Sequence, residues 1–134
     1  ANAYVTAPAV DQRQVNEMVR GLASELPAGV DLSKAKAWII FQGTGTIAIE
    51  ASYNVKSIVD VSTGRYEIHF AVPFKSENYA ALGSDSNTTA QGFTQFPTGA
   101  QFFNQIQIDC VDHAGSFQDQ RHVYALFFGE LENE

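Results

Sequence analysis

The sequence predicts a mainly β protein, an antiparallel β-sandwich of six to eight strands preceded by one N-terminal helix. Apolar and polar residues alternate through several short segments, as in 65–72 and 105–111, which is typical of strands that bury one face. Gly-containing turn signals separate these segments, and no long helical pattern follows residue 26. We therefore expect two parts: residues 1–30, an N-terminal arm and helix, and residues 31–134, the β-sandwich.

Residues 1–30 are predicted to begin as an extended arm and to continue as an amphipathic helix. Asp11 is the expected N-cap, and Pro27-Ala28-Gly29 is the expected end. One apolar stripe recurs between them at helical spacing: Val15, Met18, Val19, Leu22 and Leu26. A helix of about four turns is marginal alone in water, so this stripe must be covered. Its cover is either the chain's own sheet or other molecules, in which case the stripe serves oligomerisation or anchoring.

Residues 36–72 carry the clearest strand pattern. In the first strand, Trp38, Ile40 and Gln42 occupy one face and Ala37, Ile39 and Phe41 the other. Gly43-Thr44-Gly45 interrupts the run, because Gly accepts the positive φ that a tight turn needs. A second strand is expected to start with Ile47 and Ile49, and residues 55–61 either continue it or form a third strand. A hairpin loop at 62–64 then leads into a strand at 65–72. The only tryptophan, Trp38, is predicted to lie in the core rather than to serve as a platform for sugars.

Three features mark the second half of the chain. After a short strand at 79–83, residues 84–100 are predicted to form a long irregular segment, and such segments are often functional. Its candidate ligand-binding residues are Phe93, Thr94, Gln95 and Phe96. The alternative is that the two aromatic rings fold back as packing anchors. Residues 122–129 are apolar on both faces, which predicts a strand buried on both sides, central or covered by a helix or a neighbouring subunit.

Composition narrows the classes of partner. The net charge is −7, and the eight basic residues are scattered singly, which argues against nucleic acid as a partner. No segment approaches the ~20 apolar residues of a membrane span, so membrane insertion is not expected. A signal peptide is not recognisable, and the initial Ala favours a small complete protein after methionine removal. The single cysteine, Cys110, excludes an intrachain disulfide.

The sequence contains no strong catalytic or metal-binding motif. Cys110, His113 and His122 could be considered for zinc, and Asp109 and Asp112 for calcium, but neither set has the usual ligand number and spacing. No serine of the sequence lies in the G-x-S-x-G motif of hydrolases. A pair of carboxylates that cleaves glycans is recognised by its separation in space, so the sequence alone leaves the possibility of such a pair open. We therefore expect no enzyme activity, no cofactor and no metal site.

Residues 36–79 contain a specific string of turn and core residues: Lys36-Ala37-Trp38, Phe41, Gly43-Thr44-Gly45-Thr46, Ile49, Ser52-Tyr53-Asn54-Val55, Ser57-Ile58, Asp60, Thr63-Gly64, Tyr66, Phe70, Pro73 and Asn78-Tyr79. This string resembles a module of bacteriophage tail-fibre and related virion proteins. It spans about a third of the chain. Gln42 stands where the family commonly has Asn, and Glu50 where it often has Arg or Lys.

The resemblance implies a homotrimeric virion protein, a tail-fibre or receptor-binding component. Its β-domain would adhere to a glycan or protein of the host surface, and its N-terminal arm would contact other virion proteins. Two alternatives remain: a capsid decoration or head-fibre protein, and a glycan-processing tail enzyme.

Overall fold

The computed structural model describes residue 12, residues 30–86 and residues 92–134. The predicted helix and its apolar stripe at 15–26 lie outside the described residues. Eight strands are present in the described part of the chain: β1 (Ala37–Gln42), β2 (Ala48–Tyr53), β3 (Val55–Ser62), β4 (Arg65–Phe70), β5 (Ala80–Ser86), β6 (Gly92–Gln95), β7 (Gln105–Asp112) and β8 (His122–Phe128).

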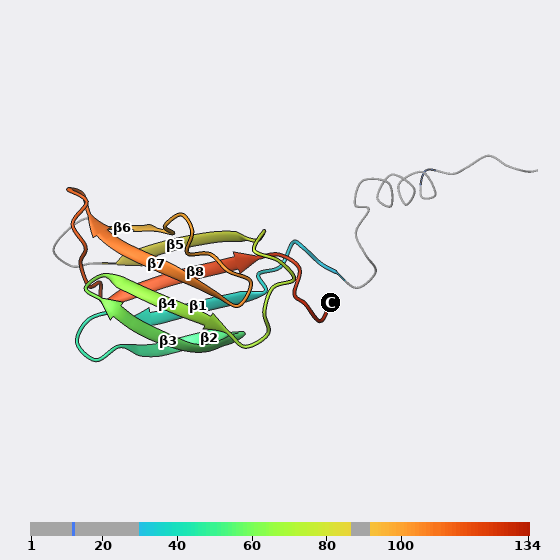
Figure 1. Ribbon diagram of the computed structural model, residues 1–134, viewed down its shortest axis with the longest axis horizontal. Coiled ribbons are helices and arrows are strands. Elements are labelled where there is room, and N and C mark those ends of the chain that lie inside the picture. Colours follow the sequence, from blue (N-terminus) through green and yellow to red (C-terminus); the bar gives the residue numbers. More distant parts are fainter. Residues whose placement is uncertain (1–11, 13–29, 87–91) are drawn as a thin grey trace, which may run out of the picture. The chain divides into compact units, whose positions relative to one another are not determined.

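The strands form two four-stranded sheets in which all neighbouring strands are antiparallel (Figure 1). Sheet A has the order β2-β1-β8-β5, and sheet B has the order β3-β4-β7-β6. The predicted mainly β, antiparallel class and the strand number are confirmed, and the arrangement is consistent with a β-sandwich. The predicted turns are also confirmed, because Gly45 and Gly64 both have positive φ, 61° and 70°.

The core lies between the two sheets and is lined by alternate residues of their central strands. The fully or nearly fully buried members are Ala37, Ile39 and Phe41 from β1, Val123, Ala125 and Phe127 from β8, Tyr66, Ile68 and Phe70 from β4, and Ile106, Ile108 and Cys110 from β7. Ring contacts join the sheets: the Phe41 and Tyr66 centroids are 5.0 Å apart, and those of Phe70 and Phe127 are 5.1 Å apart. Trp38 is half-buried on the outer face of β1. Its predicted core position is therefore wrong.

Strand β8 lies at the centre of sheet A, between β1 and β5, as its apolar sequence predicts. It is nevertheless buried on one face only. Val123, Ala125 and Phe127 point into the core, whereas Tyr124 and Leu126 are 36% and 42% exposed. The prediction that both faces are buried is wrong for the single chain, since alternation alone could not show whether another element covers the outer face.

The long segment predicted at 84–100 is largely regular in the described residues. Strand β5 runs on to Ser86, and Gly92–Gln95 form β6, which pairs with β7 at the edge of sheet B. Polar strand residues such as Ser84 and Thr94 made this stretch resemble a loop. Residues 87–91 lie outside the described part of the chain.

Asn54 connects β2 of sheet A to β3 of sheet B. It has a φ of 57°, and its amide donates to the carbonyl oxygens of Lys36 and Val72 at 3.2 and 3.0 Å. Its side-chain oxygen accepts the backbone N–H of Val72 at 2.7 Å. Asn is one of the few residue types that tolerate this backbone region.

We expect Asn54→Ala to lower the free energy of unfolding by about 2–4 kcal/mol, because it loses these hydrogen bonds and strains the positive φ. Asn54→Gly keeps the backbone conformation and should recover about 1 kcal/mol of that loss. Urea denaturation of the three proteins at one concentration measures both differences. Equal stabilities for Ala and Gly at this position would contradict the role of φ.

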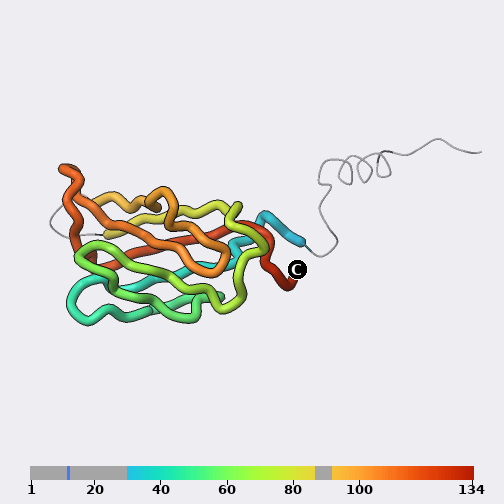
Figure 2. Tube along the Cα trace, viewed as in Figure 1, coloured from blue at the N-terminus to red at the C-terminus, as the bar shows by residue number. Residues whose placement is uncertain are grey.

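The start of β1 and the C-terminal residue meet at one end of the two sheets (Figure 2). The Lys36 ammonium donates to both carboxylate oxygens of Glu134 at 2.5 and 2.6 Å. The backbone N–H of Leu131 donates to the same carboxylate at 2.9 Å. These contacts lower the pKa of Glu134, chiefly through the Leu131 N–H and then through Lys36.

Candidate functional site

The outward surface of sheet B carries a polar network flanked by exposed aromatic rings, which we call the polar face. Its residues are Arg65 from β4, Phe93 and Gln95 from β6, Gln107 and Asp109 from β7, and Phe117 from the connection between β7 and β8. The register places them together, because Asp109 pairs with Arg65 on one side and with Gln95 on the other. The intervening residues, Ile108 and Cys110, point into the core.

Asp109 is the centre of the polar face. The residue is 1% exposed, and its carboxylate lies 3.4 Å from Arg65 Nε and accepts a hydrogen bond from Gln107 Nε2 at 2.8 Å. A buried carboxylate without such partners would be costly, and Arg65 and Gln107 compensate for the burial of Asp109. The Arg65 side chain remains 38% exposed. Its fork of N–H donors can therefore serve Asp109 and an outside ligand together.

Two aromatic rings border this network. The Arg65 guanidinium lies 4.6 Å from the centroid of Phe117, within the range of a cation–π contact. Phe117 is 41% exposed and forms a β-bridge with Val111 of β7. Phe93 of β6, which pairs with Val111 of β7, is 54% exposed. Both rings adjoin Val111, and the planar hydrogen-bonding groups of the polar face lie next to them, further along β7.

The connection that carries Phe117 is held by a ring of hydrogen bonds. Asp112 accepts the backbone N–H groups of Ala114 and Ser116 at 2.8 and 2.9 Å, and the Ser116 bond is the main cause of its lowered pKa. Asp119 accepts the Gly64 N–H at 2.7 Å, and its carboxylate lies 2.9 Å from the Tyr66 hydroxyl. These bonds tie residues 112–119 to the β3–β4 hairpin and hold Phe117 beside Arg65.

The structure separates the four predicted ligand-binding residues. Phe93 and Gln95 are exposed on the polar face. Thr94 pairs with the inward-facing Cys110, and the Phe96 ring packs 6.2 Å from that of Phe127, centroid to centroid. Phe96 is therefore a packing anchor, and Phe93 is the ring presented to solvent. Alternation within β6 explains the split, since neighbouring residues of a strand face opposite sides.

Sequence reasoning missed Arg65, Gln107 and Phe117 as functional candidates. The alternation in 65–72 and 105–111 identified Arg65 and Gln107 as outward residues. Their proximity to Asp109 depends on the pairing of β4 with β7, whose register no local pattern reveals. Phe117 lies in a polar turn region, where a single aromatic residue was the only available signal.

The metal candidates of the sequence lie apart. Cys110 is buried in the core, where burial raises the pKa of its thiol to about 12. His122 Nδ1 lies 2.9 Å from Glu50 Oε1 in sheet A, and Asp109 and Asp112 have the separate contacts described above. Among residue 12 and the ranges 30–86 and 92–134, no three His, Cys, Asp or Glu side chains form a group that could hold a metal ion.

Comparison with known proteins gives no relative. No protein-family model matches the chain, and no curated protein or solved structure matches it either. In the described part of the chain, no helix has the length and apolar character of a membrane span. Any functional inference therefore depends on the residues of the two sheets and on the resemblance at 36–79.

Proposed function

We propose that this protein is a non-enzymatic component of a bacteriophage virion, a homotrimeric tail-fibre or receptor-binding protein that adheres to the host surface. The resemblance at residues 36–79 supports the virion assignment. The arrangement of Arg65, Gln107 and Asp109 beside the exposed rings of Phe93 and Phe117 carries the assignment of adhesion to the polar face.

A host surface glycan is the ligand class that suits the polar face. Sugars present hydroxyl groups on one edge and apolar C–H groups on their ring faces. Arg and Gln side chains donate hydrogen bonds, the amide oxygens of Gln accept them, and the exposed rings of Phe93 and Phe117 supply apolar contact. A few placed polar groups beside aromatic surface are typical of small-ligand sites.

Trimerism would give such a site useful affinity. Each polar face offers only a few hydrogen-bonding groups, so a single glycan contact would be weak. Three linked sites on one particle component can raise the overall affinity ~10²-fold or more without a new contact. The predicted stripe at 15–26 supplies one apolar surface for holding copies together or for anchoring to other virion proteins.

The resemblance and the polar face support different parts of the proposal. Several residues that carry the resemblance have structural tasks here, including Gly45 and Gly64 at positive φ and Asn54 at the crossing between sheets. They support a shared fold and virion role. The polar face lies largely outside them, as expected for a surface that adapts to its own receptor.

We expect Phe93→Ala to weaken adsorption to host cells roughly 10-fold per site, because it removes an exposed aromatic contact. Gln95→Ala should weaken adsorption less. Phe103→Ala is the matched control, since Phe103 is 51% exposed but lies outside the polar face. Binding of the purified protein to host cells and to isolated surface polysaccharide measures the effect.

Adsorption that Phe93→Ala and Phe103→Ala change equally would contradict the assignment of the polar face. Labelling of the protein in the intact particle tests its place: a tail position supports the proposal, and a position over the capsomers supports the capsid decoration alternative. Release of sugar from the polysaccharide would support the glycan-processing alternative.

A further inference from the structure

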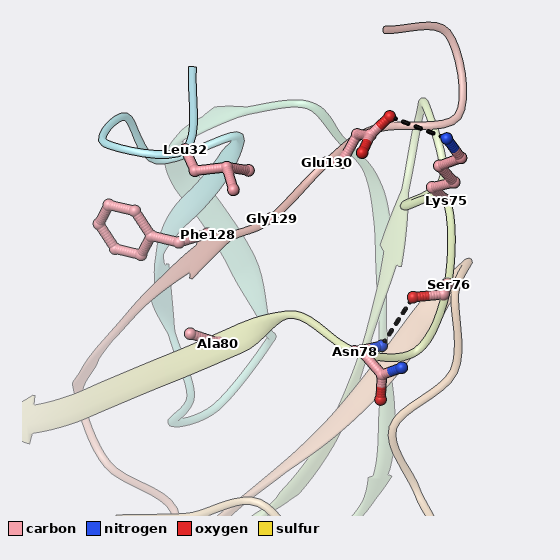
Figure 3. A pocket seen from close by; sticks show the side chains of 8 residues that line it. All are labelled: Leu32, Lys75, Ser76, Asn78, Ala80, Phe128, Gly129 and Glu130. Atoms are coloured by element: carbon pink, nitrogen blue, oxygen red, sulfur yellow. Dashed lines mark hydrogen bonds and ion pairs between the residues drawn. The ribbon is translucent and has the colours of Figure 1, made fainter. Parts of the chain in front are cut away.

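The two ends of the paired sheets differ in how their polar groups are satisfied. At the end where β1 begins and β8 finishes, an open hollow of about 440 Å³ is lined by both apolar and polar side chains (Figure 3). Its polar groups contact one another: Lys75 Nζ lies 3.1 Å from Glu130 Oε2, and Ser76 Oγ accepts the backbone N–H of Asn78 at 3.1 Å. All residues that line this hollow are described, and none of their buried side-chain polar atoms lacks a partner.

The opposite end, where β1 finishes and β8 begins, buries a polar side chain without partners. Gln120 is 0% exposed, and neither its Nε2 nor its Oε1 atom forms a hydrogen bond within the described part of the chain. The same holds for Oδ2 of Asp85, which is also buried. A buried amide or carboxylate oxygen without a partner strongly destabilises a fold, so each of these three atoms calls for one.

The main chain around Gln120 is firmly held. The carbonyl oxygen of Gln120 accepts the backbone N–H of Gly43 at 2.9 Å, just beyond β1. The preceding residue, Asp119, accepts the Gly64 N–H and lies beside the Tyr66 hydroxyl. These bonds fix the last residues of the β7–β8 connection against both sheets, with the Gln120 side chain in the interior.

The Asp85 carboxyl lies in the same interior region. Asp85 pairs with Val123, whose side chain is fully buried between the sheets. Burial raises the pKa of Asp85, and a hydrogen bond from the Cys110 thiol partly offsets this rise. Asp85 thus reaches the core from β5, the edge strand of sheet A.

Glycine at position 92 leaves space beside these polar groups. A Cβ on Gly92 would lie 2.5 Å from Asp85 Oδ1 and 2.6 Å from Gln120 Nε2. The space beside the Gly92 Cα is therefore within reach of both atoms, which form no direct hydrogen bond with each other. A water that makes hydrogen bonds of about 2.8 Å can contact both side chains from this space. Any larger residue at position 92 would fill it.

Water is the ligand that suits all the unpartnered atoms. Gln120 Nε2 donates hydrogen bonds, whereas Gln120 Oε1 and Asp85 Oδ2 accept them. A cation would leave the Nε2 donor unsatisfied, and an anion would be repelled by an ionised Asp85. Water both donates and accepts, and a buried water typically makes about three hydrogen bonds to polar groups that lack other partners.

We propose that an internal water bridges the Gln120 amide to the Asp85 carboxyl in the space beside Gly92. This water joins β5 of sheet A to the end of the β7–β8 connection, the same connection that holds Phe117 on the polar face. The inference follows from the single chain, so it is independent of the trimer and of adhesion to a host.

A high-resolution crystal structure of the full chain tests the bridge directly. We expect a water oxygen about 2.7–3.2 Å from both Gln120 Nε2 and a carboxyl oxygen of Asp85. A direct hydrogen bond between the two side chains, a Gln120 side chain turned to solvent, or another side chain in this space would overturn the proposal. Ligand distances of about 2.0–2.6 Å would identify a cation and would overturn it as well.

Urea unfolding of variants gives a second test in solution. If Gln120 and Asp85 share a water, the effects of Gln120→Leu and Asp85→Ala on the folding equilibrium constant should deviate from additivity roughly fivefold or more. Asp31→Ala is the matched control, because the Asp31 side chain is 48% exposed and lies before the start of β1. Its effect should combine with that of Gln120→Leu to within about twofold.

Additive effects of Gln120→Leu and Asp85→Ala would overturn the shared water. Coupling without a water in the crystal structure would mean that the two side chains act on each other directly, which also overturns the proposal. Should a variant fail to fold, judged by circular dichroism, the crystal structure of the wild-type chain decides.

Discussion

Gly64→Ala is expected to lower the free energy of unfolding by about 3 kcal/mol or more. Gly64 closes the β3–β4 hairpin with a φ of 70°, which costs an Ala residue about 1–2 kcal/mol. An added Cβ would also lie 2.6 Å from the Cys110 carbonyl oxygen and 2.6 Å from the Gln118 backbone nitrogen. Both obstacles are backbone atoms, so relief requires the hairpin or the β7–β8 connection to move, and such overpacking costs about 1–3 kcal/mol.

Gly45→Ala provides the control for backbone strain. Gly45 has nearly the same φ, 61°, and its Cβ would meet nothing within 4 Å. This variant should lose only the cost of the positive φ, about 1–2 kcal/mol. Urea unfolding of both variants at one protein concentration isolates the steric part. Equal losses in the free energy of unfolding would mean that the backbone of residues 110–118 can move away from a Cβ at position 64 without cost.

The second large effect is expected for Phe127→Ala, with a loss of about 3–5 kcal/mol. Phe127 is fully buried, and its ring contacts those of Phe70, Tyr79 and Phe96 at centroid distances of 5.1, 6.3 and 6.2 Å. Removal of the ring leaves a cavity between the two sheets. The sheets cannot close this cavity, because hydrogen bonds hold their strands in place.

Phe103→Ala serves again as the comparison, because Phe103 is half-exposed. Its loss should stay below about 1 kcal/mol, as is usual for surface positions. Thermal and urea unfolding of the two variants measure the contrast. If Phe127→Ala lost no more than Phe103→Ala, the packing of β8 against sheet B would have to be looser than the ring distances indicate.

Local patterns predicted the strands well where one face is buried and the other is exposed to solvent. The alternation of Tyr66, Ile68 and Phe70 with charged residues identified both the strand and its inward face. The turns at 43–45 and 62–64 followed from glycine. The same logic failed for β8, because its outer residues are as apolar as its inner ones, and among the described residues no element covers Tyr124 and Leu126.

The polar face was only half predictable. Phe93 and Gln95 were found because they lie in a polar stretch, although that stretch contains strand β6. Arg65, Gln107 and Asp109 come together through the pairing of β4 with β7, two strands whose sequences are about 40 residues apart. Such proximity depends on strand order, which the sequence does not specify by any local signal.

The central place of β8 also bears on biosynthesis. Within sheet A, β1 and β5 each pair with β8, which is synthesised after both of them. Until residues 122–128 emerge, the hairpin of β1 and β2 keeps an open edge, and β5 has no partner in that sheet. A nascent chain of this protein therefore exposes the unpaired edge of the apolar strand β1, which makes stalled or truncated translation products prone to aggregate.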